Sequence, residues 1–167
     1  MRPGSVAWWL TKMRQTKRHL LARVSPWERD AVAAWLRPEE LALYDGMHVA
    51  DRRHGLDVTA ALREAGETDR EVLIAGLLHD AGKGDTGMLP RILHALLQAR
   101  ITWPSYALGW LPGMRGALTR LRDHAETSAT LAEVAGCSAR TVELIRWQDD
   151  PQDPEAGERL RLADEAN

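Results

Sequence analysis

The sequence predicts an all-α fold in one compact domain. Apolar residues recur at helical spacing in one segment after another, and no run shows the alternation of a strand. Serine, threonine or aspartate precedes several of these segments, where it can cap a helix. The 167 residues, 44% of them hydrophobic, suffice for one ordinary hydrophobic core. The chain contains no internal repeat, so a single domain is the expectation.

The first part of the chain is expected to hold three helices. An amphipathic helix covers about residues 5–24. Ser25-Pro26-Trp27-Glu28 predicts the start of the second helix, because serine can cap it, proline fits its first position and glutamate completes a capping box. Pro38 predicts the start of the third helix, which Asp45-Gly46 ends.

The middle of the chain carries an unusually apolar helix. A helix over residues 49–64, ending near Gly66, precedes it. Thr68-Asp69-Arg70-Glu71 then predicts a capping box, and residues 72–78 have no polar side chain. A helix that is apolar on all sides is normally buried. We therefore expect this segment at the centre of the core, with His79 at its end.

The second half of the chain is expected to alternate loops and helices. Residues 82–90 form a glycine-rich loop, and residues 101–116 are irregular and rich in tryptophan and proline. Asp123 with Glu126, Ser138 and Asp153 each predict a capped helix start. The expected helices cover residues 91–100, 124–136, 138–148 and 154–167.

Charge is distributed unevenly along the chain, whose net charge is -2. No acidic residue precedes Glu28, whereas six basic residues do: Arg2, Lys12, Arg14, Lys17, Arg18 and Arg23. Removing these six from the 22 basic residues leaves 16 against 24 acidic ones, a net charge of -8 for the remainder. Residues 1–24 are therefore expected to be a basic amphipathic helix that packs on or flanks a domain at 25–167. Contact with an anionic membrane or with nucleic acid is the alternative for this segment.

The composition favours a cytoplasmic protein. Cys137 is the single cysteine, which excludes an internal disulfide and suits a reducing compartment. The apolar run Trp8-Trp9-Leu10 is cut short by Lys12, so we expect no signal peptide. The longest uncharged stretch, residues 101–114, is shorter than the roughly 20 residues of a membrane-spanning helix.

A histidine and an aspartate stand side by side where the apolar helix ends. Burying His79 and Asp80 without partners would cost about 2–7 kcal/mol for a neutral polar group and more for a charge. A divalent metal ion removes this cost, because imidazole nitrogen and carboxylate oxygen are its ligands. His54 and Asp164 lie on other expected helices, and helical domains assemble metal sites from such separated side chains.

These residues resemble the signature of the HD-domain superfamily of metal-dependent phosphohydrolases. "RHGLDV" with His54, "LLHDAGKG" with His79-Asp80 and "LADEAN" with Asp164 are similar to its three segments, over about residues 45–167. The resemblance implies an HD-type helical fold in which His54, His79, Asp80 and Asp164 hold one divalent metal ion. Mn, Fe, Co, Ni, Zn and Mg all accept such ligands.

Two further residues are expected to serve the chemistry. Lys83 and His124 are placed to bind the phosphate and to neutralise charge that builds on it, with His124 at a helix start that attracts anions. Asp80 can also accept a proton, and His124 is our first candidate for the general acid. Trp147 stands where related sequences often have another histidine, so one metal rather than two is expected, although Asp149 or Asp150 could supply a carboxylate instead.

The sequence thus predicts hydrolysis of a phosphate ester, with nucleotides among the candidate substrates and no specific binding of nucleic acid. A catalytically weak HD module that binds a ligand or partner is one alternative, and a two-metal oxygenase is another. The tryptophans at 8, 9, 27, 35 and 147 are expected in the core. Trp103, Tyr106 and Trp110 lie in the irregular segment, which packs on the domain, covers the site or, with the basic N-terminal helix, touches a membrane.

Overall fold

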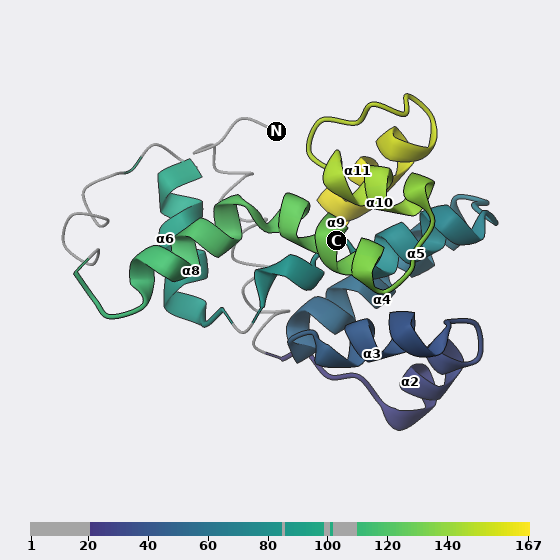
Figure 1. Cartoon of the computed structure of the whole chain (residues 1–167), viewed down its shortest axis with the longest axis horizontal. Helices are drawn as coiled ribbons and strands as arrows, with labels where there is room; N and C mark the ends of the chain where they lie inside the picture. Colours follow the sequence, from purple (N-terminus) through teal and green to yellow (C-terminus); the bar gives the residue numbers. More distant parts are fainter. Residues whose placement is uncertain (1–20, 85, 99–100, 102–109) are drawn as a thin grey trace.

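The computed structural model describes residues 21–84, 86–98, 101 and 110–167. These residues form nine α-helices and the 3₁₀ turn η1, and no strand is found among them. The all-α prediction is confirmed for this part of the chain (Figure 1). The helices are α2 (Pro26–Ala33), α3 (Pro38–Gly46), α4 (Val49–Glu64), α5 (Arg70–Leu78), α6 (Met88–Gln98), α8 (Met114–Arg122), α9 (His124–Val134), α10 (Ala139–Arg146) and α11 (Ala156–Ala166), with η1 at Ala81–Lys83.

Helix α5 is the central element of the fold, as its apolar sequence predicts. Every residue from Val72 to Leu78 is buried. The helix packs against α3, α4, α10 and α11, which surround it on several sides. Since a fully buried Leu, Ile or Val side chain contributes about 1.5–3 kcal/mol, this helix supplies much of the hydrophobic stabilisation.

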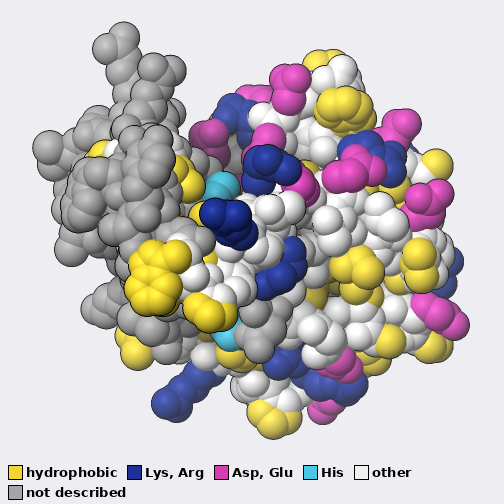
Figure 2. All heavy atoms as spheres, turned by 60° about the vertical axis from the view of Figure 1, so that its left-hand side comes forward, with side chains coloured by type: hydrophobic (Ala, Val, Ile, Leu, Met, Phe, Trp, Pro, Cys, Tyr) yellow, Lys and Arg dark blue, Asp and Glu magenta, His cyan; other side chains and the backbone are white. Residues whose placement is uncertain are grey.

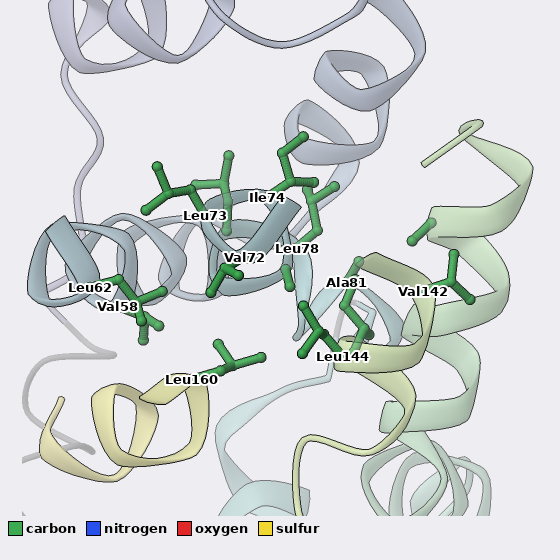
Figure 3. Close-up of a cluster of buried hydrophobic side chains, with 14 of the residues drawn as sticks. Val58, Leu62, Val72, Leu73, Ile74, Leu78, Ala81, Val142, Leu144 and Leu160 are labelled. Atoms are coloured by element: carbon green, nitrogen blue, oxygen red, sulfur yellow. The ribbon is translucent and has the colours of Figure 1, made fainter. Parts of the chain in front are cut away.

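The side chains around α5 form one continuous core (Figure 3). Val58 and Leu62 of α4 and Leu160 of α11 are buried against it. Val142 and Leu144 of α10 close the opposite side of the cluster. Helices α2, α3, α4, α9, α10 and α11 all contribute to this cluster, so they pack with α5 around one core.

Helices α6 and α8 form a pair on one side of the molecule. Figure 1 shows them side by side, away from α10 and α11. Their contact buries Leu93 of α6 with Met114, Ala117 and Leu121 of α8, outside the main core cluster. The pair contacts the rest of the fold through α8, which packs on η1 and α9, and through Arg91 of α6, which pairs with Asp51 of α4.

Several predicted helix starts are confirmed and two differ. The Ser25–Glu28 capping box is present, and the Ser138 hydroxyl accepts from the Thr141 amide. Asp69, not Thr68, caps α5, because the Glu67 carboxylate already accepts from the amides of residues 68 and 69. Asp123 makes no capping hydrogen bond for α9, since its carboxylate pairs with Arg122.

Two boundaries and one helix depart from expectation. Helix α6 begins at Met88, two residues before Pro90, because proline is tolerated in a first helical turn. Helix α8 begins at Met114, inside the segment expected to be irregular. Residues 22–25 are not helical, so the first predicted helix does not reach residue 24, and its remainder at 5–20 lies outside the described residues.

Two tryptophans expected in the core lie at the surface. Trp27 is 71% exposed and Trp147 44% exposed, because a helical pattern does not fix which face of a short helix turns inward. Trp35 packs partly buried against the core, whereas Trp8 and Trp9 lie outside the described residues. Among the described helices none has both the length and the apolar character that crossing a membrane requires.

Candidate metal centre

Three helices bring His54, His79 and Asp164 together. His54 lies in the middle of α4, His79 directly follows α5, and Asp164 lies in the last turn of α11. Asp164 Oδ1 is 2.7 Å from His54 Nε2 and 3.4 Å from His79 Nε2. One ligand atom from each residue lies within 4.8 Å of the others, which is a spacing that one metal ion could bridge. Three of the four predicted ligands therefore converge.

Asp80 lies beside this group, although it is not one of the three that meet most closely. Its Oδ1 is 3.5 Å from His79 Nε2, and its Oδ2 is 4.0 Å from His54 Nε2. The side chains of His79 and Asp80 are only 1% and 2% exposed. The fourth predicted ligand is thus close to the cluster and fully enclosed.

Two buried polar atoms at this point have no hydrogen-bond partner among the described residues. They are His79 Nε2 and Asp80 Oδ1. An unsatisfied buried polar atom costs about 1–3 kcal/mol, so native structures retain few of them without a reason. Asp80 Oδ1 carries lone pairs, and His79 Nε2 offers one once it has given up its proton, so both atoms suit a divalent cation. The donor set and these two atoms fit a metal ion.

A glycine allows α4 and α5 to approach closely enough to form the cluster. A Cβ placed on Gly55 would lie 2.3 Å from the carbonyl oxygen of Leu77. Real Cβ atoms stay at least 3.0 Å from other atoms, so no larger residue fits without moving a helix. The imidazoles of His54 and His79 flank this contact, with ring centroids 5.2 Å apart. Gly55 is a site-forming residue that the motif contains and sequence reasoning left without a role.

Hydrogen bonds orient His79 toward the cluster. Its Nδ1 donates to the carbonyl of Gly76 at 2.9 Å, which leaves Nε2 facing Asp80 and Asp164. Burial by itself lowers the pKa of His79, but the two carboxylates outweigh burial and raise it to about 9. The buried Gln148 amide donates to the His79 carbonyl at 3.1 Å. One hydrogen bond therefore holds the imidazole of His79, and another holds its backbone carbonyl.

The two carboxylates of the site are held ionised. Burial opposes ionisation of Asp80, but Lys83 and His79 bring its pKa well below the ordinary value. Burial likewise opposes ionisation of Asp164, where the hydrogen bond with His54 and the nearby imidazole of His79 keep its pKa low. The site therefore contains two ionised carboxylates, which are suitable ligands for a cation.

Lys83 and His124 both face Asp80. Lys83 Nζ donates to Asp80 Oδ2, and His124 Nε2 lies 3.6 Å from Asp80 Oδ1. Gly82 permits this arrangement, because a Cβ there would be 2.5 Å from the His124 carbonyl oxygen. The Gly82 amide also donates to the Ser128 hydroxyl, which fixes η1 on α9. The structure thus places both predicted substrate-binding residues beside the predicted ligands.

His124 presents an unprotonated nitrogen to the site. Burial and the nearby Lys83 ammonium lower its pKa, which favours the neutral imidazole. Nδ1 lies 2.9 Å from the carbonyl of Leu121 and so carries the proton. Nε2, which faces Asp80, then holds a lone pair and accepts rather than donates a proton. The general-acid role suggested for this histidine remains a prediction.

A second buried ion pair lies next to the site and was not predicted from the sequence. Asp51 lies one helical turn before His54 on α4 and pairs with Arg91 of α6 through two hydrogen bonds of 3.0 and 2.7 Å. Neither residue belongs to a recognisable motif. Their spacing of 40 residues carries no local signal that could have revealed the pair.

The other residues considered from the sequence are not part of the group that His54, His79 and Asp164 form among the described residues. Asp149 and Asp150 are exposed, as is Trp147. Trp110 is 75% exposed, whereas Trp103 and Tyr106 lie outside the described residues. Within the described part of the chain, His54, His79 and Asp164 form the single group of three or more metal-binding side chains found close together.

Comparison with known proteins yields no match. No family model fits the sequence, and no curated protein or solved structure is significantly similar to it. The interpretation of the site therefore depends on its residues and their geometry.

Proposed function

We propose that this protein is a metal-dependent phosphohydrolase with an HD-type helical fold, which cleaves a phosphate ester at the cluster of His54, His79, Asp80 and Asp164. The observation that carries the proposal is the convergence of three ligands from α4, α5 and α11 around buried lone pairs without partners. A cation at this point satisfies His79 Nε2 and Asp80 Oδ1 together.

The charge balance of the site supports an anionic substrate. The carboxylates of Asp80 and Asp164 face one ammonium, that of Lys83, so the cluster has one excess negative charge when its histidines are neutral. A bound divalent ion reverses this sign and leaves one positive charge. Figure 2 shows histidine side chains at the surface beside Lys and Arg side chains.

The reaction would be attack of a water oxygen on phosphorus, with cleavage of the ester P–O bond and protonation of the leaving oxygen. A divalent ion held by His54, His79, Asp80 and Asp164 would supply Lewis acidity, which lowers the pKa of water and withdraws charge from phosphate oxygens. Lys83 uses one N–H for Asp80 and has two left for phosphate. The neutral His124 can take up a proton through Nε2. Both side chains therefore lie next to Asp80, Lys83 at Oδ2 and His124 at Oδ1.

Metal content per chain tests the proposal first. Wild-type protein, purified without chelator and reloaded with Mn²⁺, is expected to hold one ion, and His79→Ala and Asp164→Asn to hold none. His94→Ala, a histidine on α6 outside the cluster, is the matched control and should retain the ion. A screen for phosphate release over nucleotides and other phosphate esters follows, with Lys83→Ala as the variant that binds metal but loses turnover.

The outcomes also separate the alternatives. One ion per chain without release of phosphate from any ester would favour an HD-shaped module that binds a ligand or partner without turnover. Two ions per chain would favour the two-metal oxygenase class instead. Absence of any ion from wild-type protein under saturating Mn²⁺ would reject the hydrolase.

A further inference from the structure

The loop that follows Lys83 is tied to helix α4 by one arginine. Arg91, in the first turns of α6, donates from Nε to the Thr86 carbonyl at 2.9 Å. Its two terminal nitrogens donate to both carboxylate oxygens of Asp51 on α4. The side chains of Asp51 and Arg91 are both largely enclosed. Each of the three nitrogens of this guanidinium thus donates one hydrogen bond, either to α4 or to the loop.

Thr86 continues the connection to Lys83. Its hydroxyl donates to the Lys83 carbonyl, and its amide donates to the Gly84 carbonyl at 2.8 Å. Thr86 is almost completely buried, although it lies in a loop between two helices. Arg91 therefore fixes Thr86, and Thr86 fixes the backbone from which the Lys83 side chain extends.

The same pair also acts on Lys83 through charge. Lys83 hydrogen-bonds to Asp80 and is attracted by Asp51, although Arg91 compensates most of the charge of Asp51. Asp51 is three residues before His54, so both lie on one face of α4. A buried ion pair is costly unless its hydrogen bonds are complete, as they are here. Such a pair is a specific device for holding the loop and α4 in a single arrangement.

We propose that Arg91 is a positioning residue that, anchored by Asp51 and acting through Thr86, holds the Lys83 ammonium against Asp80. That this positioning serves to present the Lys83 ammonium to a phosphate oxygen rests on the proposed function. The placement of Lys83 itself does not depend on that function and can be measured on metal-free protein.

The test measures the reactivity of Lys83 toward an amine-acetylating reagent by mass spectrometry. The chain has only three lysines, Lys12, Lys17 and Lys83, so the first two serve as internal references. Ion pairing and burial keep Lys83 unreactive in the wild type. Arg91→Ala and Thr86→Val should raise its labelling rate about fivefold or more, because the turn opens locally.

Two variants serve as controls. Thr86→Ser retains the hydroxyl and should label as the wild type does, which separates the hydrogen bond from a general loss of packing. Arg29→Ala removes another two-point arginine–aspartate pair, that of Arg29 with Asp45 between α2 and α3, and should not affect Lys83. Unchanged labelling of Lys83 in folded Thr86→Val protein would overturn the proposal.

Phosphate binding distinguishes this proposal from the proposed function. Mn²⁺-loaded Thr86→Val should retain wild-type metal affinity but bind inorganic phosphate about tenfold more weakly, as expected for a misplaced charge-assisted hydrogen bond. If wild-type protein binds neither Mn²⁺ nor phosphate, the proposed function fails while the labelling result still decides the role of Arg91. If labelling rises but phosphate affinity stays at the wild-type value, the use of Lys83 for phosphate is overturned.

Discussion

Replacing Gly55 with alanine should separate the two helices that form the metal centre. The new Cβ would lie 2.3 Å from the Leu77 carbonyl oxygen, whereas such atoms normally stay 3.0 Å apart or more, so α4 and α5 must move apart by about 0.7 Å. Overpacking of this kind costs about 1–3 kcal/mol, and the higher helix propensity of alanine returns about 1 kcal/mol. We expect a net loss of up to about 2 kcal/mol in the free energy of unfolding. His54 moves with α4, so the affinity for Mn²⁺ should fall about tenfold or more.

Urea unfolding and Mn²⁺ titration measure the two effects separately. Gly116→Ala on α8 is the matched control, because the nearest atom to its new Cβ is the flexible end of Arg120 at 3.7 Å. This control should gain about 0.5–1 kcal/mol in stability and bind Mn²⁺ as the wild type does. Wild-type stability and metal affinity in folded Gly55→Ala protein would refute the close approach of α4 and α5 as the basis of the site.

Four further predictions follow from other contacts. Ser25 and Arg53 lower the pKa of Glu28 to about 2, so the contribution of Glu28 to the free energy of unfolding is present above pH 4.5 and is lost as the pH falls through about 2. In urea unfolding, Glu28→Gln should therefore cost about 1 kcal/mol at pH 7, after allowance for solvent screening, and nothing at pH 2. The raised pKa of His79, about 9, stabilises the metal-free fold below pH 6.5, and this stabilisation disappears as the pH rises through about 9. The proton and the metal ion compete for the imidazole, so calorimetry should show that the affinity for Mn²⁺ increases with pH up to about 9. Gln148→Met removes the donor to the His79 carbonyl and should weaken Mn²⁺ binding about tenfold while retaining its stoichiometry, whereas unchanged affinity would mean that this hydrogen bond does not orient the imidazole. Residues 86–122 contain five arginines and no acidic residue, and the apolar side chains of Trp110, Leu89 and Ile92 are exposed. The protein should therefore sediment with anionic but not zwitterionic vesicles, and Trp110→Ala should reduce the bound fraction.

Local signals in the sequence predicted most of the helices. The capping residues Ser25 and Ser138 act on amides three residues away, so the contact is encoded within one helical turn. The apolar run of α5 likewise has only one stable location, the core. Helix α8 escaped prediction because Gly113, with no side chain to cap it, precedes a helix of only nine residues in a segment rich in tryptophan.

Contacts between distant residues were harder to predict. The convergence of His54, His79 and Asp164 was expected through a resemblance, and the distances among them give that expectation a geometric basis. The pair of Asp51 and Arg91 could not be predicted in this way, because no motif contains it. Any arginine of the chain could pair with any aspartate until the positions of the helices are known. Thr86 was missed for the same reason, since burial of a loop threonine depends on the helix that covers it.

The link between His54 and Asp164 also orders events in folding. These residues are 110 positions apart, so their contact closes nearly two thirds of the chain into one loop. Helices α4 and α5 can pair as soon as both are synthesised, but the third ligand arrives only when α11 docks through Leu160. An ion that binds the native state alone stabilises it by mass action. Metal uptake by a refolding chain would therefore mark the docking of α11 against α4 and α5.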